Sequence, residues 1–176
     1  VSIDYAKRIA TKLNQEQATP SNEIKPGLYI DRESPQTTHY SVMDKEGNVV
    51  SNTYTLNFSF GAGIVAKGTG ILLNNEMGDF SAKPGVPDAF GLLGGEANAV
   101  QPGKRPLSSM TPTIIFKNKE PFLVTGSPGG SRIITSVLQV ILNVIDHEMN
   151  VADATHAPRI HHQWYPDILF MEMGFS

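Results

Sequence analysis

The sequence of 176 residues contains no cysteine, which excludes disulfide bonds, thiolate nucleophiles and cysteine-ligated metals. Charged residues are also scarce, at 18%, and a formal net charge of −3 leaves no basic excess for nucleic acid or an anionic membrane. No apolar run approaches the roughly 18 residues that a membrane-spanning helix needs. What remains, with 40% apolar residues, is the composition of one globular domain with a sizeable core.

Both ends of the chain have the character of cut points. Val1 begins inside a helix-like pattern, and Ser176 follows no closing element. We therefore expect the chain to be part of a longer precursor, and the alternative is a small domain with frayed termini.

Hydrophobic periodicity and turn residues predict an α+β layered domain. Helical spacing of apolar residues predicts helices over 3–13, 133–145 and 151–157. β-forming residues between turn signals predict strands at 38–43, 49–57, 71–73, 113–116 and 122–125. The polar stretch 15–36 has linker composition, and the glycine- and proline-rich stretch 79–103 predicts a long functional loop.

The segment 36–40 lies where the composition changes from a polar linker to a strand. A threonine hydroxyl becomes a nucleophile when a base takes its proton, and a terminal threonine can use its own α-amine as that base. The α-amine has a pKa of about 7.7–8.0, so much of it is neutral near neutral pH. This chemistry requires cleavage between Gln36 and Thr37. Taken alone, a threonine pair more often simply opens a strand.

Three further polar segments can contribute to a site. The turn 126–131 precedes the long predicted helix, where free N–H groups and the helix dipole can hold an oxyanion, although a simple helix cap explains it as well. The run 74–79 carries two acids that can bind an ammonium group, or is a solvated turn. Ser108 and Ser109 can donate hydrogen bonds to a carboxylate, or belong to an ordinary loop.

The five histidines do not follow the spacing of a zinc motif. We therefore expect no metal and no cofactor, and we expect these side chains to pack or to form hydrogen bonds. They are His39, His147, His156, His161 and His162.

In combination, the segments 36–42, 53–57, 70–77, 79–85, 104–110 and 126–135 resemble γ-glutamyltranspeptidase, in that family's order and spacing. The resemblance runs from Thr37 to about Trp164, and more weakly upstream. It implies an N-terminal-nucleophile (Ntn) hydrolase with a four-layer αββα sandwich, present here as a fragment. Residues 1–36 would be the tail of the large subunit before the processing site. Residues 37–176 would be the small catalytic subunit, truncated at its C-terminal end.

The resemblance also implies catalytic roles. Thr37 would be released by self-cleavage and would act as the nucleophile, activated by a hydrogen bond from Thr55. Gly129 and Gly130 would form the oxyanion hole, in agreement with the argument from the predicted helix start.

Substrate-binding residues follow from the same resemblance. The residues that match those holding the substrate α-amino group are Asn57, Glu76 and Asp79. Those that match the α-carboxylate binders are Ser108 and Ser109. Glu76 stands where some members carry glutamine, and either side chain can accept a hydrogen bond from an ammonium. Phe90 lies in the matching lid loop, 84–95, where some relatives carry a tyrosine that covers the pocket.

The activity implied is hydrolysis or transfer of the γ-glutamyl group of glutathione and similar donors, through a γ-glutamyl-threonine acyl-enzyme. The acceptor would be water, an amino acid or a dipeptide. The expected partner is the large subunit of the same precursor, which supplies an arginine to the pocket, so the chain alone should be inactive. The family implies a periplasmic or extracellular location. Two alternatives stay open: a related acylase of the same superfamily, and a non-catalytic module that kept the fold.

Overall fold

The computed structural model describes residues 3–11, 13, 14, 16–18, 20, 37–88, 90–164 and 167–175. The helices are α1 (Ile3–Ala10), α2 (Arg132–Ile145) and α3 (Val151–His156). The strands are β1 (Thr37–Met43), β2 (Val49–Thr55), β3 (Thr113–Lys117), β4 (Glu120–Thr125), β5 (Ile160–His161) and β6 (Phe170–Met171). Two 3₁₀ turns, η2 (Glu76–Asp79) and η3 (Glu96–Asn98), lie in the long loop region. Each named strand pairs with its neighbour in sequence to form an antiparallel hairpin.

The β1–β2 hairpin begins at Thr37, one residue before the predicted strand start at Thr38. Thr37 pairs with Thr55 at its open end, and Met43 pairs with Val49 beside the turn. Within the turn, the Asp44 carboxylate accepts hydrogen bonds from the backbone N–H groups of Glu46 and Asn48, at 3.0 and 2.8 Å. These bonds close the turn locally, so the register of the hairpin follows from a few neighbouring residues.

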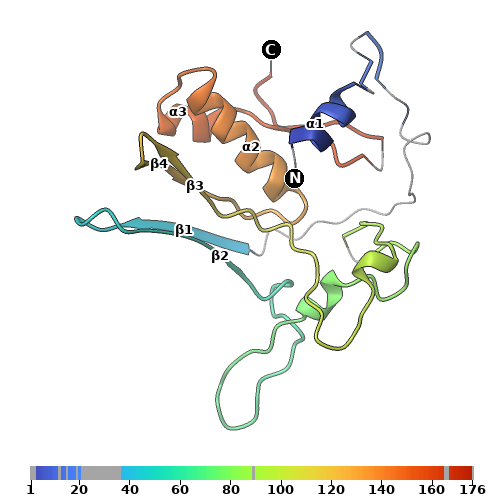
Figure 1. Ribbon diagram of the computed structural model, residues 1–176. Coiled ribbons are helices and arrows are strands. Elements are labelled where there is room, and N and C mark those ends of the chain that lie inside the picture. Colours follow the sequence, from blue (N-terminus) through green and yellow to red (C-terminus); the bar gives the residue numbers. More distant parts are fainter. Residues whose placement is uncertain are drawn as a thin grey trace.

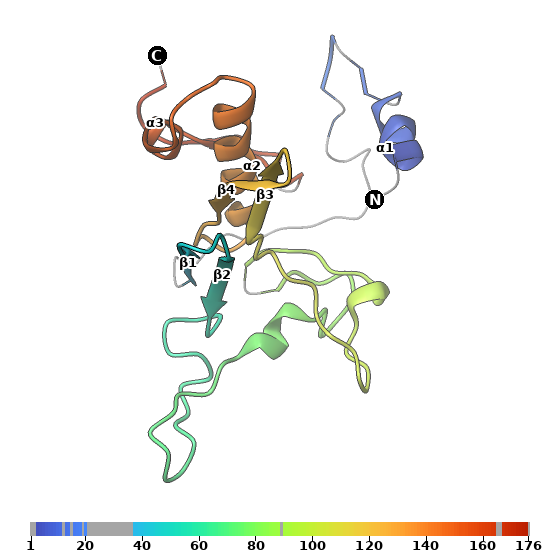
Figure 2. The same cartoon turned by 60° about the vertical axis from the view of Figure 1, so that its left-hand side comes forward.

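The two long hairpins and the C-terminal helices are stacked in layers. Figures 1 and 2 show β1–β2 on one side of β3–β4, and α2 with α3 on the other side. Side-chain hydroxyls join the two hairpins, because Ser41 Oγ donates to the Val124 carbonyl at 3.3 Å and Ser51 Oγ donates to the Thr125 carbonyl at 3.1 Å. The predicted mixture of helices and strands is therefore confirmed.

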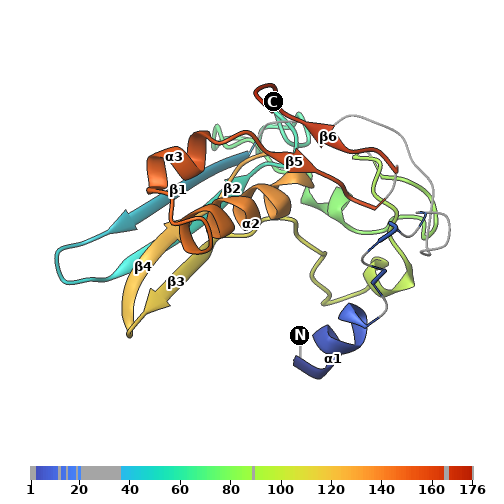
Figure 3. The ribbon, with the colours of Figure 1, turned by 90° about the horizontal axis from the view of Figure 1, so that it is seen from above.

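The buried core lies where α2 and β4 meet. On α2, apolar residues spaced four and three apart form one buried face, as expected of an amphipathic helix. Each side chain of this core is 6% exposed or less: Leu123, Ile133, Val137 and Val140. On its flank, α2 is attached to β5 through Gln139, whose amide bonds both backbone groups of Ile160. Figure 3 shows β5 running beside α2.

One face of the β1–β2 hairpin is apolar and open. Side chains alternate along a strand, so residues 40 and 42 of β1 share a face with residues 50 and 54 of β2. The side chains on this face are each more than half exposed in the described part of the chain: Tyr40, Val42, Val50 and Tyr54. The hairpin therefore packs through its polar face, which carries the serines that bond β4.

Two predictions of secondary structure need correction, and one strand pair was missed. The helix predicted over 3–13 ends at Ala10. The strand predicted at 71–73 is wrong, because that segment forms only a single bridge between Leu72 and Val65. The glycines of the 61–70 stretch hold backbone angles of the left-handed region, such as φ +80° at Gly68, which interrupts extended geometry. The short pair β5–β6 was not predicted at all. No helix in the described ranges has the length and apolar character needed to cross a bilayer.

Candidate active site

A pocket of about 630 Å³ opens where hairpin β1–β2, the loops of residues 74–110 and the start of α2 come together. The sequence-predicted site residues that line it are Thr37, Thr55, Asn57, Glu76, Asp79, Phe90, Ser108, Ser109 and Gly130. Gly129 is not among the lining residues, although it immediately precedes Gly130. The fold therefore brings together residues from five segments that are far apart in the chain.

The open end of the hairpin supplies two threonines to the pocket. Thr37 and Thr55 are directly paired there. Thr55 Oγ1 accepts a hydrogen bond from the Asn57 backbone N–H at 2.9 Å. Asn57 is buried and has φ +72°, in the left-handed region that asparagine tolerates better than most residues. Its Nδ2 donates to the Asn75 carbonyl at 3.2 Å. This bond holds the segment after β2 against the start of η2, the turn that carries the two acids.

Two carboxyl groups lie together on the 3₁₀ turn η2. Glu76 and Asp79 are three residues apart, and their side chains share a hydrogen bond. Burial, the negative charge of Asp79 and that hydrogen bond raise the pKa of Glu76 to about 7. Burial also raises the pKa of Asp79, which the bond from Glu76 opposes. The pair therefore takes up its first proton at a higher pH than an isolated carboxyl group does.

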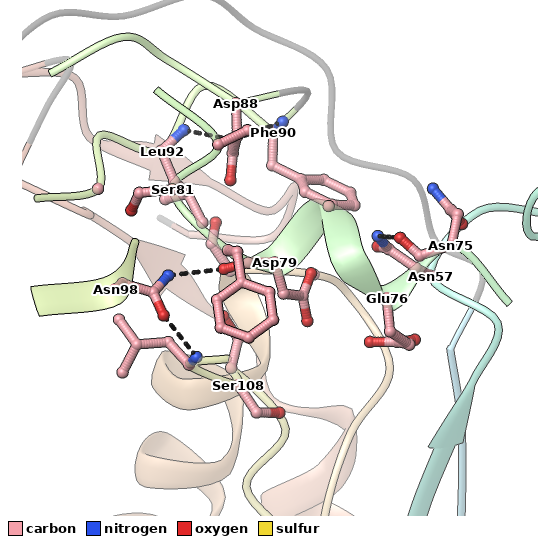
Figure 4. Close-up of a pocket in the computed structure, with 18 of the residues that line it drawn as sticks. Asn57, Asn75, Glu76, Asp79, Ser81, Asp88, Phe90, Leu92, Asn98 and Ser108 are labelled. Carbon is pink, nitrogen blue, oxygen red and sulfur yellow. Dashed lines mark hydrogen bonds between the residues drawn. The ribbon is translucent and has the colours of Figure 1, made fainter. Parts of the chain in front are cut away.

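This acid pair has room for a cation. Glu76 Oε1 is buried and makes no hydrogen bond within the described part of the chain. Figure 4 shows Glu76, Asp79 and Ser108 around the same space. An ammonium group placed there would relieve the repulsion between the carboxylates and supply donors to their oxygens.

The serine loop, residues 107–110, lines the same pocket as the two acids. Ser108 Oγ accepts a hydrogen bond from the Met110 backbone N–H at 3.1 Å, which leaves its own proton free to be donated. The Ser109 carbonyl accepts from the Thr111 hydroxyl at 2.8 Å, which fixes the loop just after the two serines. Adjacent serine hydroxyls in this geometry suit a ligand carboxylate.

Asp88 closes a local turn within residues 84–95, the segment predicted to be a lid. Its carboxylate accepts hydrogen bonds from the backbone N–H groups of Phe90 and Leu92, both at 2.8 Å. Burial raises the pKa of Asp88, and these two hydrogen bonds oppose the rise. The Phe90 ring contacts the Phe58 ring with centroids 5.5 Å apart and planes tilted by 50°. The two rings form an aromatic part of the pocket wall.

The turn at the start of α2 depends on two glycines with positive φ angles. Gly129 and Gly130 have φ of +128° and +57°, which side-chain-bearing residues rarely adopt. Their carbonyls accept from the N–H groups of Arg132 and Ile133, at 3.1 and 3.2 Å, so the turn leads directly into the helix. The turn therefore brings main-chain groups at a helix N-terminus to the pocket.

Four of the histidine side chains form hydrogen bonds: His39, His156, His161 and His162. His39 contacts Thr53 Oγ1 at 2.9 Å and Ser41 Oγ at 3.0 Å, and burial lowers its pKa. His161 contacts Thr135 Oγ1 at 2.8 Å and Gln163 Oε1 at 3.0 Å, and burial lowers its pKa as well. Among the described residues, no group of three potential metal ligands comes together.

Several pocket residues were not predicted from the sequence. They include Phe58, Ser81, Asp88 and Asn98. Nothing in the local sequence marks Phe58 or Asn98, because the residues that they contact lie elsewhere in the chain. The one available signal was the unusual length of the loop in which the last three lie.

These features define a mixed α/β protein with a small-molecule pocket that contains paired acids, paired serines and a glycine turn. The family model described as Gamma-glutamyltranspeptidase matches residues 1–176. The chain is 64% identical over 172 residues to the glutathione hydrolase proenzyme of Escherichia coli (strain K12), covering 98% of this chain and 30% of that protein. It is 56% identical over 164 residues to that of Pseudomonas sp. (strain A14), covering 93% and 28%.

Solved structures agree with this match. A mutant of Helicobacter pylori gamma-glutamyltranspeptidase has a TM-score of 0.74 at 63% identity, covering 76% of this chain and 72% of that chain. The Bacillus anthracis transpeptidase CapD has a TM-score of 0.57 at 27% identity, covering 79% and 68%. The chain belongs to the gamma-glutamyltranspeptidase family, and it spans about 30% of the length of these curated relatives.

Proposed function

We propose that the complete protein transfers the γ-glutamyl group of glutathione, or of a similar γ-glutamyl amide, to water, an amino acid or a dipeptide. The observation that carries the proposal is that one pocket gathers acids, serines and threonines from separate segments. Relatives that share 64% and 56% of their residues with this chain are glutathione hydrolase proenzymes, which supports the donor.

The two walls of the pocket suit the two charges of a γ-glutamyl donor. Glu76 and Asp79, with Asn57 beside them, would hold the α-ammonium group. Ser108 and Ser109 would hold the α-carboxylate. A ligand with both charges on one carbon is then oriented with its γ-carbonyl toward Thr37.

In the reaction, the Thr37 hydroxyl attacks the γ-carbonyl and forms a γ-glutamyl ester. The free α-amine of Thr37 takes the hydroxyl proton and passes it to the leaving amine. Backbone N–H groups at Gly129 and Gly130 stabilise the oxyanion, where the loss of one donor typically slows catalysis by about 10²–10³-fold. Water or an acceptor amine then cleaves the ester and restores the hydroxyl.

This mechanism requires self-cleavage before Thr37. Gln36 lies outside the described residues, and the proenzyme names of the relatives support processing. The same proposal includes a heterodimer with the large subunit, in which both parts complete a four-layer αββα sandwich. Three stacked layers in this chain support that arrangement. A periplasmic or extracellular location is also proposed, and cell fractionation tests it.

The experiment uses the complete protein and a γ-glutamyl p-nitroanilide. Wild-type protein should release nitroaniline, and its small fragment should begin at Thr37 by N-terminal sequencing. Thr37→Ala should remain a single chain by intact mass and should release none. The matched control is Thr38→Ala, because Thr38 is exposed on the other face of β1 and should leave both properties intact. Retained hydrolysis by Thr37→Ala would remove Thr37 from the mechanism.

A further inference from the structure

Asn98 connects the two parts of the pocket that would bind the charged groups of the donor. These are the ammonium-binding wall, formed by Glu76 and Asp79, and the carboxylate-binding wall, formed by Ser108 and Ser109. The buried side chain of Asn98, 8% exposed, stands at the end of η3. Its Nδ2 donates to the Asp79 carbonyl at 2.7 Å, and its Oδ1 accepts from the Leu107 N–H at 3.0 Å. Figure 4 shows both bonds, with Asn98 between Asp79 and the segment that leads to Ser108. One side chain therefore links the end of the acidic turn to the start of the serine loop.

The backbone of Asn98 adds a third connection. Its carbonyl accepts from the Ser81 N–H at 2.9 Å, two residues after Asp79. The next carbonyl, of Ala99, accepts from Lys104 Nζ at 3.0 Å. The position of Asn98 is thus fixed on both sides before its amide reaches Asp79 and Leu107.

The spacing of the two walls matters because an α-amino acid carries its ammonium and its carboxylate on one carbon. A site that grips both groups must hold its acids and its serines at a fixed separation. A displacement of about 1 Å can reduce catalysis by about 10²-fold. No ladder of paired strands runs between the described residues 76–79 and 107–109, so their separation depends on local bonds such as those of Asn98.

We propose that Asn98 is a positioning residue that sets the distance between the ammonium-binding and carboxylate-binding walls, and with it the selectivity for donors with a free α-amino acid end. The inference rests on the proposed function. Asn98 acts through Asp79 and the serine loop rather than on the reacting atoms.

The test compares three p-nitroanilides in the complete protein. The γ-glutamyl donor carries both charges, the glutaryl donor lacks the α-ammonium, and the 4-aminobutyryl donor lacks the α-carboxylate. Asn98→Ala should lower kcat/KM for the γ-glutamyl donor by roughly ten- to a hundredfold, mainly through KM. The two truncated donors bind one wall only, so their kcat/KM should change by less than about threefold. Selectivity for the γ-glutamyl donor should therefore fall by at least about threefold.

Asn98→Asp separates the two bonds. An aspartate keeps the acceptor for the Leu107 N–H and loses the donor to the Asp79 carbonyl. This variant should lose its preference for the γ-glutamyl donor over the glutaryl donor. It should keep most of its preference for the γ-glutamyl donor over the 4-aminobutyryl donor. Where the alanine variant does not accumulate as folded protein, the aspartate variant decides the question by the same ratios.

Gln139→Ala is the matched control. The Gln139 amide makes a comparable pair of bonds to the backbone of Ile160, at 2.9 and 2.8 Å, and does not line the pocket. Its loss should lower thermal stability and leave the selectivity ratios unchanged.

The outcomes separate the two proposals. A ratio of kcat/KM values does not depend on how much enzyme is folded, so a purely structural role for Asn98 would leave selectivity unchanged and would overturn the inference. A wild-type protein that hydrolyses none of the γ-glutamyl donor would overturn the proposed function, and this inference with it.

Discussion

Thr37 and Thr55 are opposite each other in the last pair of the β1–β2 hairpin, where both line the pocket. Directly opposed residues in an antiparallel pair have Cβ atoms about 4.5–5.5 Å apart, within reach of a hydrogen bond between their hydroxyls. Thr55 Oγ1 already accepts a bond from the Asn57 N–H, so its own proton is available for Thr37. Sheet register thereby places one hydroxyl beside another.

The first prediction concerns this pair. In the complete protein, Thr55→Val keeps the shape of the side chain and removes the hydroxyl, so kcat should fall roughly 10²-fold while KM stays within about twofold. Thr55→Ser keeps the hydroxyl and should retain most of the rate. Steady-state kinetics with a γ-glutamyl anilide measures both, and a valine variant with wild-type kcat would contradict an activating role for Thr55.

The second prediction concerns the pH dependence of donor binding. Because the pKa of Glu76 is about 7, the acid pair gains a proton as pH falls through this value and attracts an ammonium less strongly. KM should therefore rise from pH 8 to about pH 5.5. Glu76→Gln has no proton to gain, so its KM should be nearly flat over this range. A wild-type KM that does not vary with pH would exclude this role for the pair.

A further part of the second prediction concerns stability. The folded state raises the pKa of Glu76 above its ordinary value of 4.5, so folding favours the protonated form. This contribution is present below about pH 4.5 and is lost as pH rises through about 7. The melting temperature of Glu76→Gln, relative to wild type, should therefore increase across that interval. Thermal unfolding in a pH series provides the measurement.

A third prediction concerns the close contact between Gly94 and Ser81. A Cβ on Gly94 would overlap Ser81 Oγ and stand 2.7 Å from Ser81 Cβ, which forces the pocket wall to move. Gly94→Ala should destabilise the complete protein by about 1–3 kcal/mol. Gly95→Ala is the control, since a Cβ there meets nothing within 4 Å and Gly95 has an ordinary φ of −104°. Adding Ser81→Gly to Gly94→Ala should restore most of the lost free energy of unfolding, as measured by denaturant unfolding.

The fourth prediction concerns the ring contact between Phe58 and Phe90. Replacing either residue with leucine should weaken donor binding, because each ring supports the other at the pocket wall. A double-mutant cycle on the donor KM should give a coupling of about 0.5–1.5 kcal/mol. Strictly additive effects on the donor KM would show that the contact between the two rings contributes nothing to donor binding.

Local sequence signals account well for the long elements. The hairpin beginning at Thr37 and the helix α2 were predictable because β-forming residues, a turn and helical spacing lie within each segment. The strand predicted at 71–73 was wrong because apolar character alone does not outweigh the neighbouring glycines. The pair β5–β6 has two residues in each strand, too few to leave any periodicity.

The pocket was predictable only where residues form a motif. Glu76 and Asp79 stand in one short run, and Gly129 and Gly130 are adjacent, so sequence comparison detects them. Asn98 carries no such signal, because its amide bonds reach 19 residues back and nine residues forward. Contacts of that kind depend on the path of the loop, which local propensity does not determine.

The register of the hairpin has one more consequence. All seven residues of β1, beginning with Thr37 itself, are matched with residues of β2. Among the described residues, the β1–β2 ladder therefore begins at Thr37. Cleavage before Thr37 would leave the new α-amino group held beside Thr55 by the rest of β1. Maturation would then require no search by the new chain end, which would already be docked where it has to react.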